Sequence, residues 1–265
     1  MNFEENKDLA HRQHVKYFMR FLNVLPSSLA AHDSTRMTIA YFSVAGLDVL
    51  GAISTVSLDM RSRIIEWIYR LQVHPNKDRC ESDMRFVYCA ACISYMLHDW
   101  SGFDIDKTTD FIINSILESH GGTTFCALAS LSLMNQMHKL TEAQVEGLKR
   151  WLMYRQVDGF QGRPNKPVDT CYSFWVGASL KILDTLKFTN YGSNRRYVYD
   201  TQDTVVGGFS KWPDTCTDPM HTYLGLAGLS LIGENGLLEI EPRLNITKRA
   251  YEHLKTLHRS WDNQS

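Results

Sequence analysis

The ends of the expected helices follow a repeated pattern, which constrains the fold more than any other feature. A segment that ends in glutamine is followed by a loop with glycine and an aromatic residue, and then by a polar turn and a new apolar segment. The pattern occurs at Gln156, before Gly159-Phe160, and at Gln202, before Gly208-Phe209. The two glutamines are 46 residues apart, a period typical of stacked helical hairpins. Partial copies lie at residues 71–73 and 120–125.

Apolar residues recur at three-to-four spacing along most of the chain, and few runs alternate apolar and polar residues. This periodicity predicts an all-α protein. Each hairpin buries its apolar face only against its neighbours, so the hairpins stack into a solenoid or close into a ring. The expected helices are, to within several residues, 14–24, 34–51, 58–72, 84–100, 106–117, 122–137, 141–156, 169–186, 193–202, 218–233 and 245–259.

The composition is that of an ordinary globular protein. With 265 residues, 44% hydrophobic and 22% charged, the chain is long enough to bury a large core, and we expect a single domain over residues 1–265. A net charge of −1, without a basic face, excludes a nucleic-acid partner. The segment 1–14 lacks the order of a signal peptide, and the apolar run 86–97 is too short to span a membrane.

We therefore expect a cytoplasmic protein with reduced cysteines. Cys89 and Cys92 form a CxxC pair within an apolar segment that has no matching second pair. At positions i and i+3 of a helix, the two small side chains share one face, so we expect both of them to pack in the core.

Asp169, Cys171 and His221 offer a carboxylate, a thiolate and an imidazole, which are ligand types that Zn²⁺ accepts. Three protein ligands leave a fourth position for a substrate, which indicates a catalytic rather than a structural metal. Asp-x-Cys alone is a pattern that chance supplies freely. In a closed ring, however, the helices that begin near Asp169 and Pro219 start side by side at one rim, and the three ligands converge. The ligand spacing thus favours a ring with a zinc site at its rim.

A basic loop precedes these ligands. Arg163, Lys166 and the hydroxyl of Tyr172 suit a phosphate or diphosphate beside a metal, and helix N-termini add unpaired N–H groups. The alternative interpretation of this loop is a solvated basic turn. His120, which precedes a Gly-Gly turn, fits a capping or packing role as well as a role in the site. Trp175 fits either the core or the lining of an apolar cavity beside the rim.

Six segments, which read SDMRFVYCA, ESHGGTTFC, GRPNKPVD, DTCYSFWVGASLKIL, VGGFSKWPD and DPMHTYLGLAGLSL, together resemble the β subunits of protein prenyltransferases, and most closely those of geranylgeranyltransferase type I. The resemblance extends from about residue 12 to the C-terminus. It implies an α–α barrel, or toroid, around an aromatic lipid cavity, with a separate α subunit wrapped around it. It also implies transfer of geranylgeranyl from geranylgeranyl diphosphate to the cysteine thiol of a C-terminal CaaX motif, as found on small GTPases.

The resemblance further implies a role for each matching residue. The metal ligands are Asp169, Cys171 and His221, which hold one Zn²⁺, and the CaaX thiol takes the open position. Lys211 stands where farnesyltransferases carry an acidic residue associated with Mg²⁺, so we expect Mg²⁺-independent chemistry. Thr38 is a small residue that leaves room for a fourth isoprene unit. The residues that match the diphosphate site are His120, Arg163, Lys166 and Tyr172; those that match peptide or lipid contacts are Arg85, Phe86, Trp175, Met220 and Leu224.

The chain departs from this family at two places. A long segment that the family has is reduced to residues 76–83, and a glycine-rich loop is absent near residues 115–118. Missing helices would open the barrel or close it with fewer repeats. Two classes therefore stay open: the catalytic β subunit, or an impaired variant that binds the α subunit without turnover. Farnesyl-type and Rab-type β subunits remain alternatives, whereas a terpene cyclase is disfavoured because the chain has no DxDD or carboxylate-rich motif.

Overall fold

Helices dominate the computed structural model, which describes residues 8–23, 36–70, 83–116 and 120–263. The expected all-α architecture is confirmed, and the helices lie within a few residues of their predicted positions. They are α1 (His11–Asn23), α2 (Arg36–Val49), α3 (Leu58–Arg70), α4 (Met84–Leu97), α5 (Ile105–Ser115), α6 (Gly121–Leu133), α7 (Glu142–Met153), α8 (Tyr172–Ile182), α9 (Tyr191–Asp200), α10 (Pro219–Leu231) and α11 (Lys248–Asp262).

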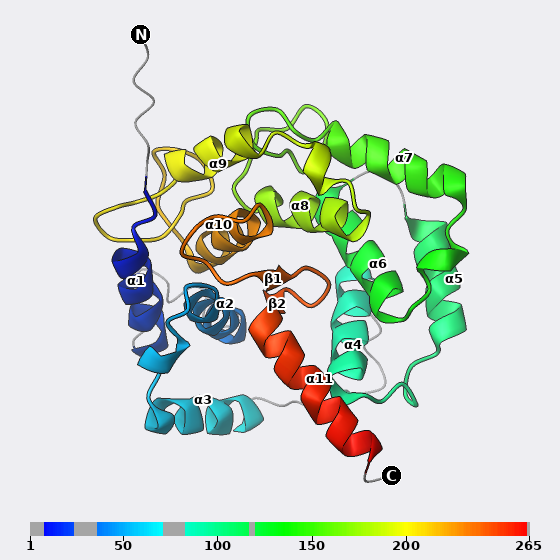
Figure 1. Ribbon diagram of the computed structural model, residues 1–265, viewed down its shortest axis with the longest axis horizontal. Helices are drawn as coiled ribbons and strands as arrows, with labels where there is room; N and C mark the ends of the chain where they lie inside the picture. Colours follow the sequence, from blue (N-terminus) through cyan, green and yellow to red (C-terminus); the bar gives the residue numbers. More distant parts are fainter. Residues whose placement is uncertain (1–7, 24–35, 71–82, 117–119, 264–265) are drawn as a thin grey trace.

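The helices form two layers of a toroid (Figure 1). In the inner layer, α4 packs on α6, α6 on α8, α8 on α10 and α10 on α2. The helices α1, α5, α7 and α9 lie outside this layer. The chain thus alternates between an outer and an inner helix, as expected for helical hairpins that close into a ring.

The composition of the inner helices explains their place. Helix α10 is apolar or small on every side, and all of its residues except Met220 are buried; a helix that is apolar all round belongs in a core. Glycine allows close packing between α10 and α8, because a Cβ on Gly228 would lie 2.6 Å from Cβ of Ser173. Outer helix α7, by contrast, buries only Leu148, Trp151 and Leu152.

The repeated helix ends have the same structure in both copies. Gln156 forms a β-bridge with Phe160, and Gln202 forms the corresponding bridge with Phe209. A second bridge follows in each turn, between residues 161 and 168 and between residues 210 and 217. Phe160 and Phe209 are almost completely buried. The aromatic residue of the pattern therefore anchors each turn to the core.

A short hairpin was not expected from the sequence. Strands β1 (Ile240–Glu241) and β2 (Ile246–Thr247) pair antiparallel between α10 and α11, and Figure 1 places them near the middle of the ring. The hydroxyl of Tyr88 on α4 donates to the carbonyl of Arg243, and those of Tyr41 on α2 and Tyr223 on α10 donate to the carbonyl of Asn245. The hairpin tip is thus held by three inner helices.

Several apolar side chains of α3 and α4 are exposed. They include Ile65 and Tyr69 on α3 and Phe86 and Ile93 on α4. The prediction that both cysteines of the CxxC pair pack in the core is wrong for Cys89, which is exposed, while Cys92 is partly buried. Exposed residues along one stripe of α4 indicate that this helix face is not covered by another part of the described chain.

Most of the expected shortened segment at 76–83 and half of the one at 115–118 lie outside the described residues, because residues 71–82 and 117–119 are not described. The partial repeat at 71–73 lies outside them as well. Every helix in the described part of the chain is too short or too polar to cross a membrane.

Candidate metal centre at the toroid rim

Three neighbouring inner helices begin at one rim of the toroid. The N-cap residues of α6, α8 and α10 are His120, Cys171 and Asp218. The Nδ1 atom of His120 accepts the N–H of Gly122 at 3.2 Å, and the carboxylate of Asp218 accepts the N–H of His221 at 2.9 Å. These two caps fix the starts of α6 and α10, whereas Cys171 makes no side-chain cap hydrogen bond; all three residues place titratable side chains at the positive ends of the helix dipoles.

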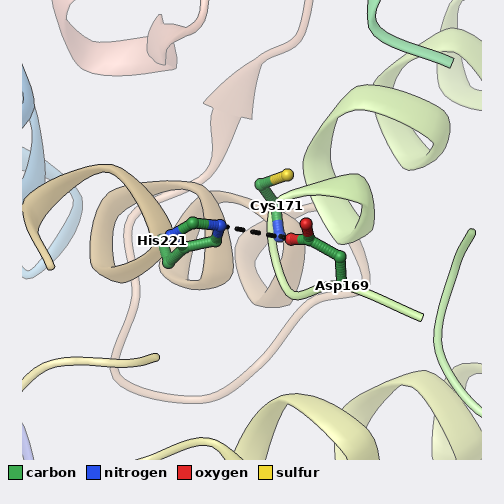
Figure 2. Close-up of side chains that lie close together, drawn as sticks. All are labelled: Asp169, Cys171 and His221. Carbon is green, nitrogen blue, oxygen red and sulfur yellow. Dashed lines mark hydrogen bonds and ion pairs between the residues drawn. The ribbon is translucent and has the colours of Figure 1, made fainter. Parts of the chain in front are cut away.

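Asp169, Cys171 and His221 converge at this rim (Figure 2). One ligand atom from each residue lies within 4.8 Å of the others, and all three residues are buried. Asp169 Oδ1 accepts the N–H of Cys171 at 2.9 Å and lies 3.3 Å from Nε2 of His221. The structure therefore brings the imidazole of His221 to a carboxylate and a thiol that lie 52 and 50 residues earlier in the sequence.

The orientation of His221 fits a metal ligand. Its Nδ1 atom lies 2.5 Å from Oδ2 of Asp218, so the neutral ring carries its proton on Nδ1 and leaves the lone pair on Nε2. Among the described residues, Nε2 is buried and makes no hydrogen bond of good geometry, although Oδ1 of Asp169 lies 3.3 Å away. A buried nitrogen that is poorly paired costs free energy unless something binds it. Together with the oxygen and sulfur donors beside it, this atom fits Zn²⁺.

The pKa values of the three ligands describe the chain without a metal. Burial raises the pKa of Cys171 well above 9.0, and the carboxylate of Asp169 raises it further. Burial lowers the pKa of His221, but its contacts with Asp169 and Asp218 outweigh burial and raise the value to about 9. Burial raises the pKa of Asp169, yet the contacts with His221 and Cys171 lower it overall. A metal ion that binds here must displace protons from Cys171 and His221.

A second group lies beside the candidate metal ligands. The hydroxyl of Tyr172 is 3.0 Å from Nε2 of His120. Because Nδ1 of His120 accepts the N–H of Gly122, its Nε2–H donates to Tyr172, which leaves the tyrosine O–H free to donate elsewhere. Burial and the charge of Arg163 lower the pKa of His120, which keeps the ring neutral at pH 7. Burial, Cys171 and Asp169 raise the pKa of Tyr172 to about 12.

Lys211 is close to the candidate metal ligands as well. Its Nζ atom lies 3.7 Å from Oδ2 of Asp169 and 4.4 Å from the centre of the Trp212 ring. The site therefore combines a buried carboxylate–thiol–imidazole set with at least one cation on its edge.

The remaining predicted residues are spread over the ring. Arg163 and Lys166 are exposed on the loop before α8, and Thr38 is exposed on α2. On α4, Arg85 pairs with Asp83 at 2.8 Å, and half of Phe86 is exposed. The roles of these residues stay predictions. On the inner helices, the ring centres of Trp175 and Phe125 are 5.1 Å apart. Met220 is partly exposed beside His221, and Leu224 is fully buried.

Asp218 and Trp212 were not among the predicted site residues. For Asp218 a signal existed, because an aspartate followed by proline marks a helix start, and the residue three positions after the cap is His221. For Trp212, the sequence gives only its place after Lys211. The stacking of the ammonium on the ring depends on how the turn folds.

The family model for the prenyltransferase alpha-alpha toroid domain matches residues 9–80 and 73–246. The geranylgeranyl transferase type-1 subunit beta of Dictyostelium discoideum is 27% identical over 333 aligned residues, which cover 89% of this chain and 94% of that protein. The alignment is longer than the 265 residues of this chain, so that relative contains segments without a counterpart here.

Two further proteins are similar over most of the chain. The geranylgeranyl transferase type-1 subunit beta of Arabidopsis thaliana is 36% identical over 241 residues, which cover 81% of this chain and 64% of that protein. Among solved structures, the Candida albicans protein geranylgeranyltransferase-I complexed with GGPP matches with a TM-score of 0.83 and 26% identity. That match covers 94% of this chain and 99% of the other.

Proposed function

This chain belongs to the family of proteins with the prenyltransferase alpha-alpha toroid domain, and we propose that it is the catalytic β subunit of a zinc-dependent protein geranylgeranyltransferase type I. The proposed reaction transfers geranylgeranyl from geranylgeranyl diphosphate to the cysteine thiol of a C-terminal CaaX motif. The observation that carries the proposal is the buried set of Asp169, Cys171 and His221, whose ligand atoms lie within 4.8 Å of one another. A prenyltransferase α subunit is the proposed partner, and the cytoplasm is the proposed location.

The proposed metal ligands are Asp169, Cys171 and His221. A zinc ion held by these side chains would act as a Lewis acid and favour the thiolate form of a substrate thiol at neutral pH. The chain itself excludes water from the three ligands by burial and aims the lone pair of His221 Nε2 through the contact of Nδ1 with Asp218. Both features prepare the side chains for a metal before it binds.

The proposed diphosphate site consists of His120, Tyr172, Arg163, Lys166 and Lys211. The free O–H of Tyr172 and the cations of this group are suited to neutralise charge that develops on a leaving diphosphate. A neutral His120 orients the tyrosine through Nε2–H. Lys211 supplies a positive charge near the metal ligands, and for this reason we propose that transfer does not require Mg²⁺.

The proposed lipid and peptide contacts lie on inner helices. Thr38 on α2 is the residue that we propose to set lipid length. Each isoprene unit has about five carbons, worth several kcal/mol at about 0.8 kcal/mol per buried methylene, so a bulky side chain there would select strongly. Trp175 and Leu224 are proposed to contact the lipid. The proposed peptide contacts are Arg85, Phe86 and Met220.

A second candidate function is an impaired variant that binds the α subunit without turnover. It is favoured by the exposed apolar side chains of α3 and α4 and by the length of the alignment with the Dictyostelium protein. We propose, on the same grounds, that the chain lacks helices between α3 and α4 and a loop near residues 115–118. The two family-model matches meet at residues 73–80, which supports the first of these gaps.

One experiment separates the two functions. The chain is co-expressed with a prenyltransferase α subunit, and zinc content, complex formation and prenyl transfer to a CaaX peptide are measured with geranylgeranyl and farnesyl diphosphates in competition. Transfer with about one zinc per chain, with geranylgeranyl preferred and without added Mg²⁺, supports the proposed enzyme. A stable complex that contains zinc but gives no transfer supports the impaired variant, and a preference for farnesyl would refute the proposed lipid.

A further inference from the structure

The ammonium group of Lys211 lies between two attractive groups. It is 4.4 Å from the centre of the Trp212 ring and 3.7 Å from Oδ2 of Asp169. The second distance is too long for a hydrogen bond. The ammonium therefore contacts the aromatic face closely, while its approach to the carboxylate is incomplete.

The backbone that carries these two side chains is fixed. The carbonyl of Lys211 accepts the N–H of Thr170 at 3.2 Å and the Tyr197 hydroxyl at 3.4 Å. The carbonyl of Trp212 accepts the hydroxyls of Ser210 at 2.6 Å and Thr215 at 2.7 Å. Because both carbonyls are held, the ring and the start of the lysine side chain project from a rigid turn.

Another lysine of the chain behaves differently. Lys187 is also followed by an aromatic residue, Phe188, but its Nζ atom lies 2.7 Å from Oδ2 of Asp184 and 5.4 Å from the ring centre. At that exposed position the ammonium pairs with the carboxylate rather than with the ring. The Lys211 ammonium, by contrast, lies nearer to its ring and farther from its carboxylate than the Lys187 ammonium does.

We infer that Trp212 is a positioning residue that holds the Lys211 ammonium at the edge of the metal site, off Asp169, where it faces an incoming diphosphate. This inference rests on the proposed function, which assigns Lys211 to that group. A tryptophan face attracts a cation through its quadrupole and donates no hydrogen bond to it. The ammonium thus keeps its three N–H donors for an anion, and the carboxylate of Asp169 stays available to a metal.

The test is a double-mutant cycle on binding of inorganic pyrophosphate to the full chain, loaded with zinc and in complex with the α subunit if one forms. Trp212→Leu should weaken pyrophosphate binding about 2- to 5-fold, which corresponds to a partly exposed cation–π contact. Trp212→Phe should restore most of that loss. In the Lys211→Met background, Trp212→Leu should have no further effect, because the ring then has no cation to hold.

An equal loss in both backgrounds would mean that Trp212 only supports the fold of the turn, and would overturn the inference. The inference would also be overturned if Trp212→Leu left pyrophosphate binding unchanged, or if the parent chain did not bind pyrophosphate. A second readout is zinc affinity, measured by competition with a chelator. In Trp212→Leu the Lys211 ammonium is free to pair with Asp169, which should weaken zinc binding. When Trp212→Leu is combined with Lys211→Met, the ammonium is absent and this weakening should disappear. Because neither readout needs prenyl transfer, a chain without transferase activity would refute the proposed function and still decide the role of Trp212.

Discussion

Replacement of Asp218 by asparagine separates helix capping from metal binding. One carboxylate oxygen of Asp218 accepts the N–H of His221 at 2.9 Å and caps α10, and the other lies 2.5 Å from Nδ1 of the same residue. Asparagine keeps an oxygen for the cap but presents an NH₂ group to Nδ1–H. The imidazole must then move its proton to Nε2 or rotate, and either change removes the lone pair from the metal site.

The expected cost follows from these two contacts. Asparagine and aspartate are similar as N-caps, so the free energy of unfolding of the metal-free chain should change by only a few tenths of a kcal/mol through the cap. Loss of a group that orients a histidine ligand typically weakens metal binding about 10- to 100-fold, or about 1.4–2.8 kcal/mol. Zinc affinity is measured by competition with a chelator, and stability by thermal unfolding.

Thr141 provides a matched control. It caps α7 through a capping box with Gln144, on an outer helix. Thr141→Ala should destabilise the fold by about 1 kcal/mol without changing zinc affinity. Unchanged zinc affinity in Asp218→Asn, or an equal decrease in Thr141→Ala, would refute the argument that Asp218 orients His221 for a metal.

Three further predictions concern lipid length, pH and backbone conformation. Thr38→Trp should shift the lipid preference toward farnesyl in competition assays, and an unchanged ratio would contradict its proposed role. In the metal-free chain, despite burial, contacts with Asp169 and Asp218 raise the pKa of His221 from an ordinary 6.5 to about 9. The stabilisation of the fold by the protonated ring is therefore complete below pH 6.5 and is lost as pH rises through 9. At about 1.36 kcal/mol per unit, at most about 3 kcal/mol should disappear over this range, and thermal unfolding of His221→Gln should lack that loss. Gly207→Ala should cost more than Gly233→Ala in denaturant unfolding, because both glycines have positive φ but only at Gly207 would a Cβ meet the backbone of Gln13, at 2.4 Å; equal costs would show that α1 gives way.

The helices and the repeated turns could be predicted from the sequence because their signals are local. Apolar periodicity marked each helix, and the glutamine and aromatic residues of the turns at Gln156 and Gln202 form matching β-bridges. The convergence of Asp169, Cys171 and His221 could be predicted for a related reason: these residues lie at the starts of neighbouring inner helices, so a ring of regular repeats brings them together. In a fold built from regular repeats, residues at equivalent positions of neighbouring repeats lie close together in space.

The features that the sequence did not reveal depend on contacts between distant segments. The hairpin formed by β1 and β2 has two residues in each strand, too few for a pattern, and its tip is held by tyrosines from three helices. His14 is a second example. It is fully buried. Its Nε2 atom lies 2.8 Å from Oε1 of Gln202, and its Nδ1 atom accepts the N–H of Gly208 at 2.8 Å. Burial lowers its pKa to about 4. Such a neutral histidine binds α1 to the turn before α10, but nothing near residue 14 indicates this partner.

The C-terminal segment connects α2 and α4, the two inner helices on either side of the proposed gap. At its start, Thr247 and Arg249 bind the buried carboxylate of Asp48 on α2. At its other end, His258 lies 3.2 Å from the carbonyl of Met96 at the end of α4. Figure 1 shows α11 running on the side of the ring between α2 and α4. Among the described residues, the inner helices pack in series from α4 to α2 through α6, α8 and α10. The hairpin and α11 supply contacts that join the two ends of that series. A toroid with fewer inner helices can therefore keep the rim at α6, α8 and α10 intact, and these are the helices that carry the proposed zinc ligands.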